Sequence, residues 1–272
     1  MKLIVIPPSK GMNWTPEKGQ YMVYELVENM RKAGQLKGVD IDIDEGYPFP
    51  VAELGSPSCD EEFLIHLGVG LVRKVKEFSQ MGKYDAIVTT CDLDAGFFAT
   101  RHVSKIPVTP VAHSSFHVAS LIGERFTYFA VADGCSSIVR HCAQNYGFND
   151  KLVSVRHPSL SSTYLASFVK NYDKEERNKV PEVKEIIKTL TAQCIAAIEK
   201  DRVDSIIFGC SAVQVYVDEV RQELDKAGYS EVPIICGLYA ALEMAKVMVN
   251  MKLTHTARAY PGDDLKAKPE FR

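Results

Sequence analysis

Many hydrophobic residues of the chain fall into short runs, most of them unbroken, which are separated by longer segments in which hydrophobic residues recur at helical spacing. Unbroken runs, without alternating polar residues, are typical of parallel strands that helices cover on both faces. The predicted strands are Leu3–Pro7, Val39–Asp44, Ala86–Thr90, Val108–Val111, Phe126–Ala132, Leu152–Arg156, Ser205–Phe208 and Pro233–Cys236.

The intervening segments predict helices. Asp60–Met81 carries apolar residues close to a period of 3.6, as an amphipathic helix does. The other predicted helices are Tyr21–Gly34, which ends at a glycine, Pro181–Lys200, which begins with proline, Val213–Ala227 and Tyr239–Val249. Alternating strands and helices indicate an α/β fold with parallel sheets, and 272 residues suffice for about two domains.

Three segments depart from this alternation. Gly46–Cys59 is rich in proline and glycine and predicts a loop or insertion. Asn171–Lys179 is dense in charge and predicts a solvated loop or a helix start. The polar end of the chain, Thr254–Arg272, predicts a loosely packed extension.

The chain contains an internal repeat. Tyr84–Cys91 resembles Val203–Cys210, and each copy is followed by a helical pattern. After those helices come Ile106-Pro107-Val108 in the first copy and Val232-Pro233-Ile234 in the second. We therefore expect two related half-units, each with a cysteine at the carboxyl end of a strand, where ligands of open α/β sheets bind.

Composition narrows the function classes. The net charge of −3 gives no basic footprint for nucleic acid, and no apolar run approaches the ~20 residues needed to span a bilayer. The seven cysteines are odd in number, contain no Cys-x-x-Cys pair and follow no visible secretion signal. They predict reduced thiols in a cytoplasmic protein.

The repeat distinguishes Cys91 and Cys210 from the other cysteines. A thiol between a strand and a helix lies near unpaired N–H groups, which lower its pKa from about 8.5 toward neutrality. Two such cysteines facing each other can invert a stereocentre beside a carbonyl: a thiolate removes the proton, and a thiol delivers one to the opposite face. This chemistry needs no metal or organic cofactor. Asp92 would oppose thiolate formation if it pointed inward.

The same segments resemble a known family. Cys91-Asp92-Leu93-Asp94-Ala95-Gly96 is similar to Cys-Phe-Gly-Asp-Pro-Gly, and Gly209-Cys210-Ser211-Ala212 is similar to Gly-Cys-Ala-Gly. Further similarity covers Leu3–Lys10, Phe126–Gly147 and Val232–Met244. In order and spacing these motifs resemble the aspartate/glutamate/hydantoin racemase superfamily, most closely its hydantoin and allantoin racemase branch.

The resemblance implies two flavodoxin-like lobes related by a pseudo-twofold axis, with the active site in the cleft between them. Residues 1–104 and 230–272 would form one lobe and residues 105–229 the other. Cys91 and Cys210 would be the acid/base pair in a homo-oligomeric, cofactor-independent enzyme acting on a small molecule. Substrate-binding positions would be Ser9, Asp92, Leu93, His113, Ser211 and Ala212.

Several residues depart from the branch and leave the substrate open. The first loop has Pro7-Pro8-Ser9 in place of Asn-Pro-Asn, and Asp92, His113 and Cys236 replace other residue types. His113 and His117 have the spacing of metal ligands on one helix face, but no third ligand is evident, so we predict no metal site. Cys59, Cys135, Cys142, Cys194 and Cys236 are predicted to be structural.

The sequence thus predicts an isomerase that racemises a hydantoin-type or related compound with an acidic C–H. Two alternatives stay open. The first is a cis–trans isomerase or decarboxylase of small dicarboxylates, although the decarboxylases need only one of the two cysteines. The second is a two-lobed binding protein that has lost catalysis, which Asp92 and the altered first loop favour.

Overall fold

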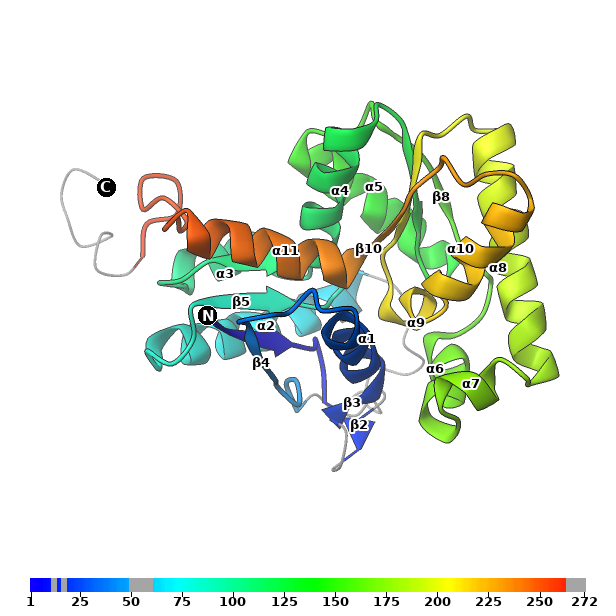
Figure 1. Cartoon of the computed structure of the whole chain (residues 1–272). Coiled ribbons are helices and arrows are strands. Elements are labelled where there is room, and N and C mark those ends of the chain that lie inside the picture. The colour runs from blue at the N-terminus through cyan, green and yellow to red at the C-terminus, as the bar shows by residue number, and fades with distance from the viewer. Residues whose placement is uncertain (11–13, 16–18, 49–60, 263–272) are drawn as a thin grey trace.

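A computed structural model describes residues 1–10, 14–15, 19–48 and 61–262 of the chain. In these residues the long strands form two four-stranded parallel sheets, and the short strands β2 (Trp14–Thr15) and β3 (Gly19–Gln20) pair antiparallel. The sheets lie in two lobes, as Figure 1 shows.

The first sheet has the strand order β4-β1-β5-β6. Its strands are β1 (Lys2–Ile6), β4 (Asp40–Ile43), β5 (Ala86–Thr89) and β6 (Val108–Pro110). The helices in this part of the chain are α1 (Tyr21–Lys32), α2 (Glu61–Gln80) and α3 (Phe97–Val103).

The second sheet has the order β10-β9-β7-β8. Its strands are β7 (Phe126–Phe129), β8 (Leu152–Arg156), β9 (Ser205–Phe208) and β10 (Ile234–Cys236). A short 3₁₀ helix, Asp133–Cys135, precedes the helices α5 (Ser136–Tyr146), α6 (Ser162–Asn171), α7 (Lys174–Arg177), α8 (Pro181–Glu199), α9 (Ser211–Gln214) and α10 (Val217–Lys226).

The two sheets have the same topology. If the strands of each are numbered along the chain, both run in the order second, first, third, fourth. The two halves of the sequence repeat therefore occupy equivalent places, with β5 matching β9 and β6 matching β10. The predicted two-lobed α/β fold with parallel sheets is confirmed.

Two helices carry the chain between the lobes. The helix α4 (Val111–Ile122) follows β6 of the first sheet but packs on β9 and β10 of the second. The helix α11 (Gly237–Asn250) follows β10 of the second sheet and packs on β5 and β6 of the first. The two helices also pack against each other. Because β6 still belongs to the first sheet and β10 to the second, the chain passes from one lobe to the other at the starts of α4 and α11. These points lie a few residues beyond the expected positions at 105 and 230.

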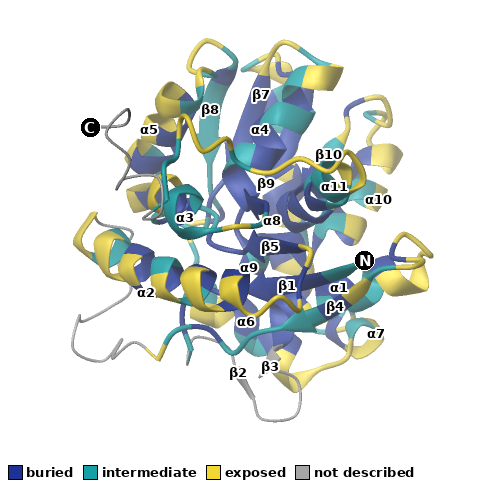
Figure 2. Cartoon of the chain, turned by 90° about the vertical axis from the view of Figure 1, so that its left-hand side faces the viewer, coloured by how far each residue is buried: buried dark blue, intermediate teal, exposed yellow. Residues whose placement is uncertain are grey.

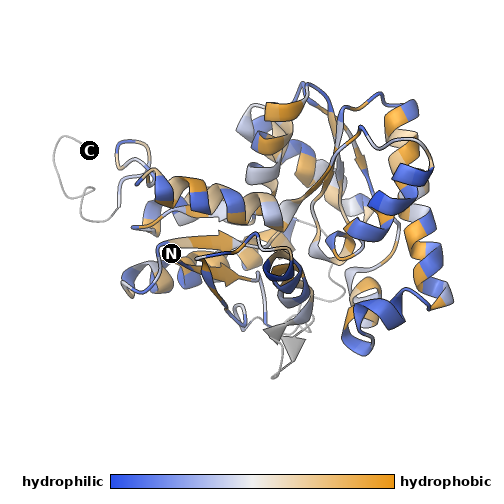
Figure 3. Ribbon diagram, in the orientation of Figure 1, coloured by the Kyte–Doolittle hydropathy of each residue, from blue (hydrophilic) through white to orange (hydrophobic). Residues whose placement is uncertain are grey.

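The strands form the core because helices cover the sheets. Every residue of β5, β7 and β9 is buried, which explains why their sequences show no alternation of polar and apolar residues. Figure 2 shows the sheets as buried layers among helices with exposed outer faces. Figure 3 shows the matching pattern of hydrophobic strands and hydrophilic outer helix surfaces.

All eight predicted strands are present, with ends that shift by three residues or fewer. The predicted helix Val213–Ala227 is instead two helices, α9 and α10, with a break near Val215 and Tyr216. In the part of the predicted extension that the structure describes, residues 254–262, no residue is buried, but individual side chains contact the first lobe. There His255 Nε2 accepts a hydrogen bond of 3.0 Å from the Val108 N–H.

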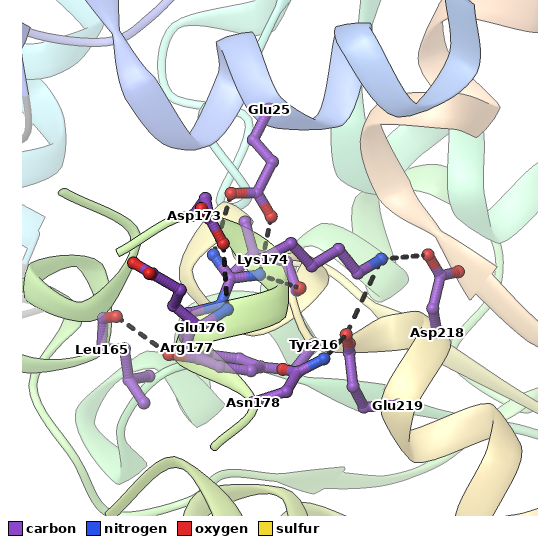
Figure 4. A network of polar contacts seen from close by, with 11 residues as sticks. Glu25, Leu165, Asp173, Lys174, Glu176, Arg177, Asn178, Tyr216, Asp218 and Glu219 are labelled. Atoms are coloured by element: carbon purple, nitrogen blue, oxygen red, sulfur yellow. Dashed lines mark hydrogen bonds and ion pairs between the residues drawn. The ribbon is translucent and has the colours of Figure 1, made fainter. Parts of the chain in front are cut away.

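The charged segment Asn171–Lys179 is mostly exposed and contains the short helix α7, in agreement with the predicted solvated loop or helix start. The exception is Arg177, whose side chain is completely buried rather than solvated. Its guanidinium makes two hydrogen bonds to the Glu25 carboxylate of α1 (Figure 4). Most of the other unusual segment, Gly46–Cys59, lies outside the described residues.

Candidate active site

Cys91 lies in the turn that follows β5, at the carboxyl edge of the first sheet. The turn is closed by a hydrogen bond of 3.1 Å from the Asp94 N–H to the Cys91 carbonyl, and Asp94 has a positive φ of 49°. The thiol is 3% exposed, and the backbone N–H groups of Leu93 and Ala95 interact with its sulfur. Successive N–H groups turned toward one atom form an anion-binding concavity.

Cys210 occupies the equivalent position at the carboxyl edge of the second sheet. It follows β9 and immediately precedes α9, and it is 8% exposed. The backbone N–H groups of Ala212 and Val213, in the first turn of α9, interact with its sulfur. Each lobe therefore presents one cysteine whose sulfur faces two peptide N–H groups.

Tyr128 of β7 brings the two cysteine turns together. Its side chain is completely buried, and its hydroxyl donates a hydrogen bond of 2.6 Å to the Asp92 carbonyl. The same hydroxyl lies against Gly209, where an added Cβ would be only 2.0 Å from the phenolic oxygen. Because no real Cβ fits there, position 209 requires glycine. Asp92, which follows Cys91, and Gly209, which precedes Cys210, thus both contact the buried Tyr128 hydroxyl.

Burial dominates the acidity of both thiols. Burial, followed by the charge of Asp92, raises the pKa of Cys91 to about 12, although the two N–H groups act in the opposite direction. The same causes raise the pKa of Cys210 well above its ordinary value. The expectation of a pKa near neutrality is therefore wrong. The peptide N–H groups do favour the thiolate, but desolvation outweighs them.

Two buried side chains tie the cysteine turns to the crossing helices. Asp94 accepts hydrogen bonds from the N–H groups of Ala112 (2.9 Å) and His113 (2.7 Å) in α4, and from the Tyr146 hydroxyl (2.9 Å). In the other lobe, Gln214 donates to the Gly209 carbonyl and accepts a bond of 3.0 Å from the Leu238 N–H of α11. These contacts satisfy N–H groups in the first turns of both helices, which have no partner within the helix.

Asp94 gives a testable pH dependence. Burial raises the pKa of Asp94 to about 7, whereas its pKa in the unfolded chain is about 3.9. Between these two pKa values the folded state binds more protons than the unfolded state. The contribution of Asp94 to the free energy of unfolding therefore increases as the pH falls from 8. The effect amounts to about 1.4 kcal/mol per pH unit below the folded-state pKa. Between pH 8 and 5.5 the free energy of unfolding of wild type should therefore rise by about 2 kcal/mol relative to that of Asp94→Asn, as measured by urea unfolding.

The comparison must be made as a difference between the two proteins. Burial lowers the pKa of His113 to about 3 and that of His255 to about 4, and both destabilise the fold as the pH falls below their unfolded values. These effects are shared by wild type and Asp94→Asn, so they cancel. Parallel stability curves for the two proteins across this pH range would contradict the role given to Asp94.

The structure places most of the other predicted site residues around the two turns. Ser9 is 2% exposed and follows β1, the strand beside β5. Leu93 and Ala212 are buried and contribute the backbone N–H groups already described, and Ser211 begins α9. Asp92 has a pKa raised to about 6 by burial.

His113 lies in a different environment. Its ring packs against Phe97, His117 and Tyr146, and its Nε2 is 3.0 Å from Arg101 Nη2. These contacts place His113 in an aromatic cluster beside Arg101. Among the described residues, no group of three or more His, Cys, Asp or Glu side chains could hold a metal ion.

The remaining cysteines are of two kinds. Cys142, Cys194 and Cys236 are free and buried, as expected of structural cysteines. Cys135 is disulfide-bonded, so the prediction of seven reduced thiols is wrong at this position. Cys59 lies outside the described residues.

Sequence inspection missed a cavity of about 770 Å³ between α2, α3 and α5. Its lining includes Leu64, Leu93, Phe98 and Tyr146 but neither Cys91 nor Cys210. Beside it, Gly68 and Gly96 allow two backbones to approach, since a Cβ on Gly96 would lie 2.8 Å from the Gly68 Cα. The glycines of α2 therefore serve packing.

The fold and the site thus define a two-lobed α/β protein with one cysteine at the equivalent strand end of each lobe. Comparison with known proteins is specific: the family model described as Asp/Glu/hydantoin racemase matches residues 59–245. The chain belongs to the Asp/Glu/hydantoin racemase family, and the predicted enzyme class, an isomerase, is confirmed.

Individual relatives agree with the expected branch. The chain is 25% identical over 210 residues to a hydantoin racemase of Pseudomonas sp. (strain NS671), covering 76% of each protein. It is 24% identical over 179 residues to a hydantoin racemase of Paenarthrobacter aurescens, covering 66% of this chain and 67% of the relative.

Solved structures share the fold along nearly the whole chain. The allantoin racemase from Klebsiella pneumoniae matches with a TM-score of 0.72 and 20% identity, covering 99% of both chains. The allantoin racemase from Pseudomonas fluorescens matches with a TM-score of 0.73 and 17% identity, covering 96% of this chain and 97% of that one. Separately, no helix in the described parts of the chain is long and apolar enough to cross a membrane.

Proposed function

We propose that this protein is a cofactor-independent racemase in which Cys91 and Cys210 are the acid/base pair. The observation that carries the proposal is the equivalence of the two cysteines. Each follows the third strand of its sheet, and each sulfur faces two backbone N–H groups of the turn or helix behind it. A pair acting on opposite faces of one carbon needs this kind of symmetry.

The proposed reaction has two proton transfers. One cysteine, as thiolate, takes the proton from a carbon beside a carbonyl, and the electron pair of the broken C–H bond moves onto the carbonyl oxygen as an enolate. The other cysteine, as thiol, donates its proton to the opposite face, and the carbonyl re-forms. Peptide N–H groups of the two turns stabilise negative charge during the exchange. Afterwards the two cysteines have exchanged protonation states.

We propose a hydantoin-type or related small carbonyl compound as the substrate. The support is the family and the hydantoin racemases among the relatives. The test is to incubate single enantiomers of hydantoins, allantoin, aspartate and glutamate with the protein in deuterated water. Loss of optical activity together with deuterium at the stereocentre is the expected result for a hydantoin-type compound. Absence of exchange on all of them would contradict the proposal.

The raised thiol pKa predicts how the activity depends on pH. With a pKa of about 12, Cys91 is almost entirely protonated at pH 7, and its thiolate fraction grows about tenfold per pH unit. Because the reaction needs one thiolate, we expect kcat/KM to rise continuously from pH 7 to pH 10. A rate that is constant over this range, measured by polarimetry in buffers of equal ionic strength, would contradict the proposed base.

One alternative has a specific observation in its favour. The carboxylate of Asp92, whose Oδ2 is buried, and the high pKa of both thiols suit a two-lobed binding protein that does not catalyse proton transfer. That alternative predicts binding of a small molecule, measured by calorimetry, without deuterium uptake at any pH. A dicarboxylate isomerase or decarboxylase would instead convert dicarboxylates into products detectable by NMR.

A further inference from the structure

Asp92, directly after Cys91, has a carboxylate oxygen that nothing in the described structure satisfies. Its Oδ2 is buried and has no hydrogen-bond partner among the described residues. Buried polar atoms are nearly always paired, because leaving one without a partner costs free energy. The described residues therefore supply no donor for this oxygen.

The carboxylate of Asp94, two residues further along the same turn, differs from that of Asp92 because its oxygens have hydrogen-bond donors. Asp94 is also buried, but its two oxygens accept three hydrogen bonds from Ala112, His113 and Tyr146. Asp94 thus serves the packing of the turn on α4. Asp92 has no comparable set of donors, so packing does not account for its charge.

The position of Asp92 is between the two cysteine turns. Its carbonyl accepts the Tyr128 hydroxyl at 2.6 Å, and that hydroxyl contacts Gly209, the residue before Cys210. Its carboxylate is also close enough to both thiols to raise the pKa of Cys91 and of Cys210. Asp92 therefore lies where Tyr128 links the turn that holds Cys91 to the turn that holds Cys210.

We propose that Asp92 determines substrate specificity by accepting a hydrogen bond from an N–H group of the substrate and repelling substrates that place a carboxylate there. The class selected is a small carbonyl compound with an N–H near the reacting carbon, such as a cyclic ureide or an amide. Dicarboxylates without an N–H are excluded. This inference rests on the proposed thiol pair.

A pair of alkylating reagents tests the charge selection without needing turnover. Iodoacetamide is neutral and carries N–H groups, whereas iodoacetate is an anion of similar size. The modification of Cys91 and Cys210 by each reagent is followed by mass spectrometry at pH 8, with rates normalised to those of glutathione. Because the same thiolate reacts with both reagents, the ratio of the two rates cancels any change in the thiol pKa.

We expect wild type to favour iodoacetamide, and Asp92→Asn to lower that preference at least about tenfold, mainly by accelerating iodoacetate. Asp92→Glu, which keeps the charge, should retain the preference. The matched control is Asp85→Asn, at the opposite end of β5, which should leave the ratio unchanged. A ratio in Asp92→Asn within twofold of wild type overturns the inference.

If neither reagent modifies the thiols, a binding measurement tests the role of Asp92 instead. By calorimetry, Asp92→Asn should weaken the binding of an unsubstituted hydantoin and strengthen that of succinate. Unchanged affinities for both ligands overturn the inference. If wild type shows these Asp92-dependent preferences but racemises no compound, the proposed function fails while the specificity role of Asp92 stands.

Discussion

Cys91→Ser and Cys210→Ser should each abolish detectable racemisation, with an expected loss of at least about 10²–10⁴-fold in kcat. The reason is the same for both: a serine hydroxyl holds its proton far more tightly than a thiol, so it can neither serve as the base nor return a proton at a useful rate. Initial rates by polarimetry, with circular dichroism to verify folding, measure the effect.

Cys194→Ser is the matched control for these substitutions. Cys194 is a free, completely buried thiol within α8, and its pKa is raised by burial like those of the other two. A general effect of placing serine in the core would therefore appear in this variant as well. Racemisation should survive in Cys194→Ser, and full activity in either Cys91→Ser or Cys210→Ser would contradict the assignment of a cysteine pair.

Arg177→Ala should destabilise the protein by about 3–5 kcal/mol, because it removes a completely buried guanidinium and leaves the Glu25 carboxylate, which is only 18% exposed, without its partner. Arg177 is completely buried, and its two terminal nitrogens donate to the Glu25 oxygens at 2.8 and 2.7 Å (Figure 4). It also donates a bond of 3.3 Å to the Val215 carbonyl, just beyond α9. The substitution thus removes the link from α1 to the segment behind Cys210.

Urea unfolding of three variants tests this expectation. Arg177→Lys keeps the charge but loses the paired geometry, so its loss of stability should be intermediate. Lys188→Ala removes an exposed ion pair with Glu185 and should change the free energy of unfolding by no more than about 1 kcal/mol. If Arg177→Ala is as stable as Lys188→Ala, the buried pair does not hold α7 in place.

Local patterns sufficed to predict the sheets and the two cysteines. Strand residues buried on both faces leave a continuous apolar run, as in β5 and β9, so most of the strands are recognisable without any knowledge of their neighbours. The repeat then placed Cys91 and Cys210 at equivalent strand ends, where the structure has them. Each of these features is visible in a short stretch of sequence or in the comparison of two such stretches.

Features that depend on distant partners could not be predicted in this way. Arg177 is separated by 152 residues from Glu25, and within its own segment it looks like any solvated charge. Tyr128 is one aromatic residue of a buried strand until its contact with Gly209 is known. The pKa of each thiol also depends on distant residues. The sequence shows the backbone N–H groups that lower this pKa, but not the burial that raises it.

The position of the deuterium early in the reaction tests the cysteine pair most directly. A single enantiomer of a hydantoin substrate is incubated with the enzyme in deuterated water, and substrate and product are separated on a chiral column at low conversion. Two bases on opposite faces predict deuterium in the product enantiomer, while the recovered substrate still carries protium. Equal labelling of both enantiomers from the first time point would indicate one base serving both faces and would contradict the pairing of Cys91 with Cys210.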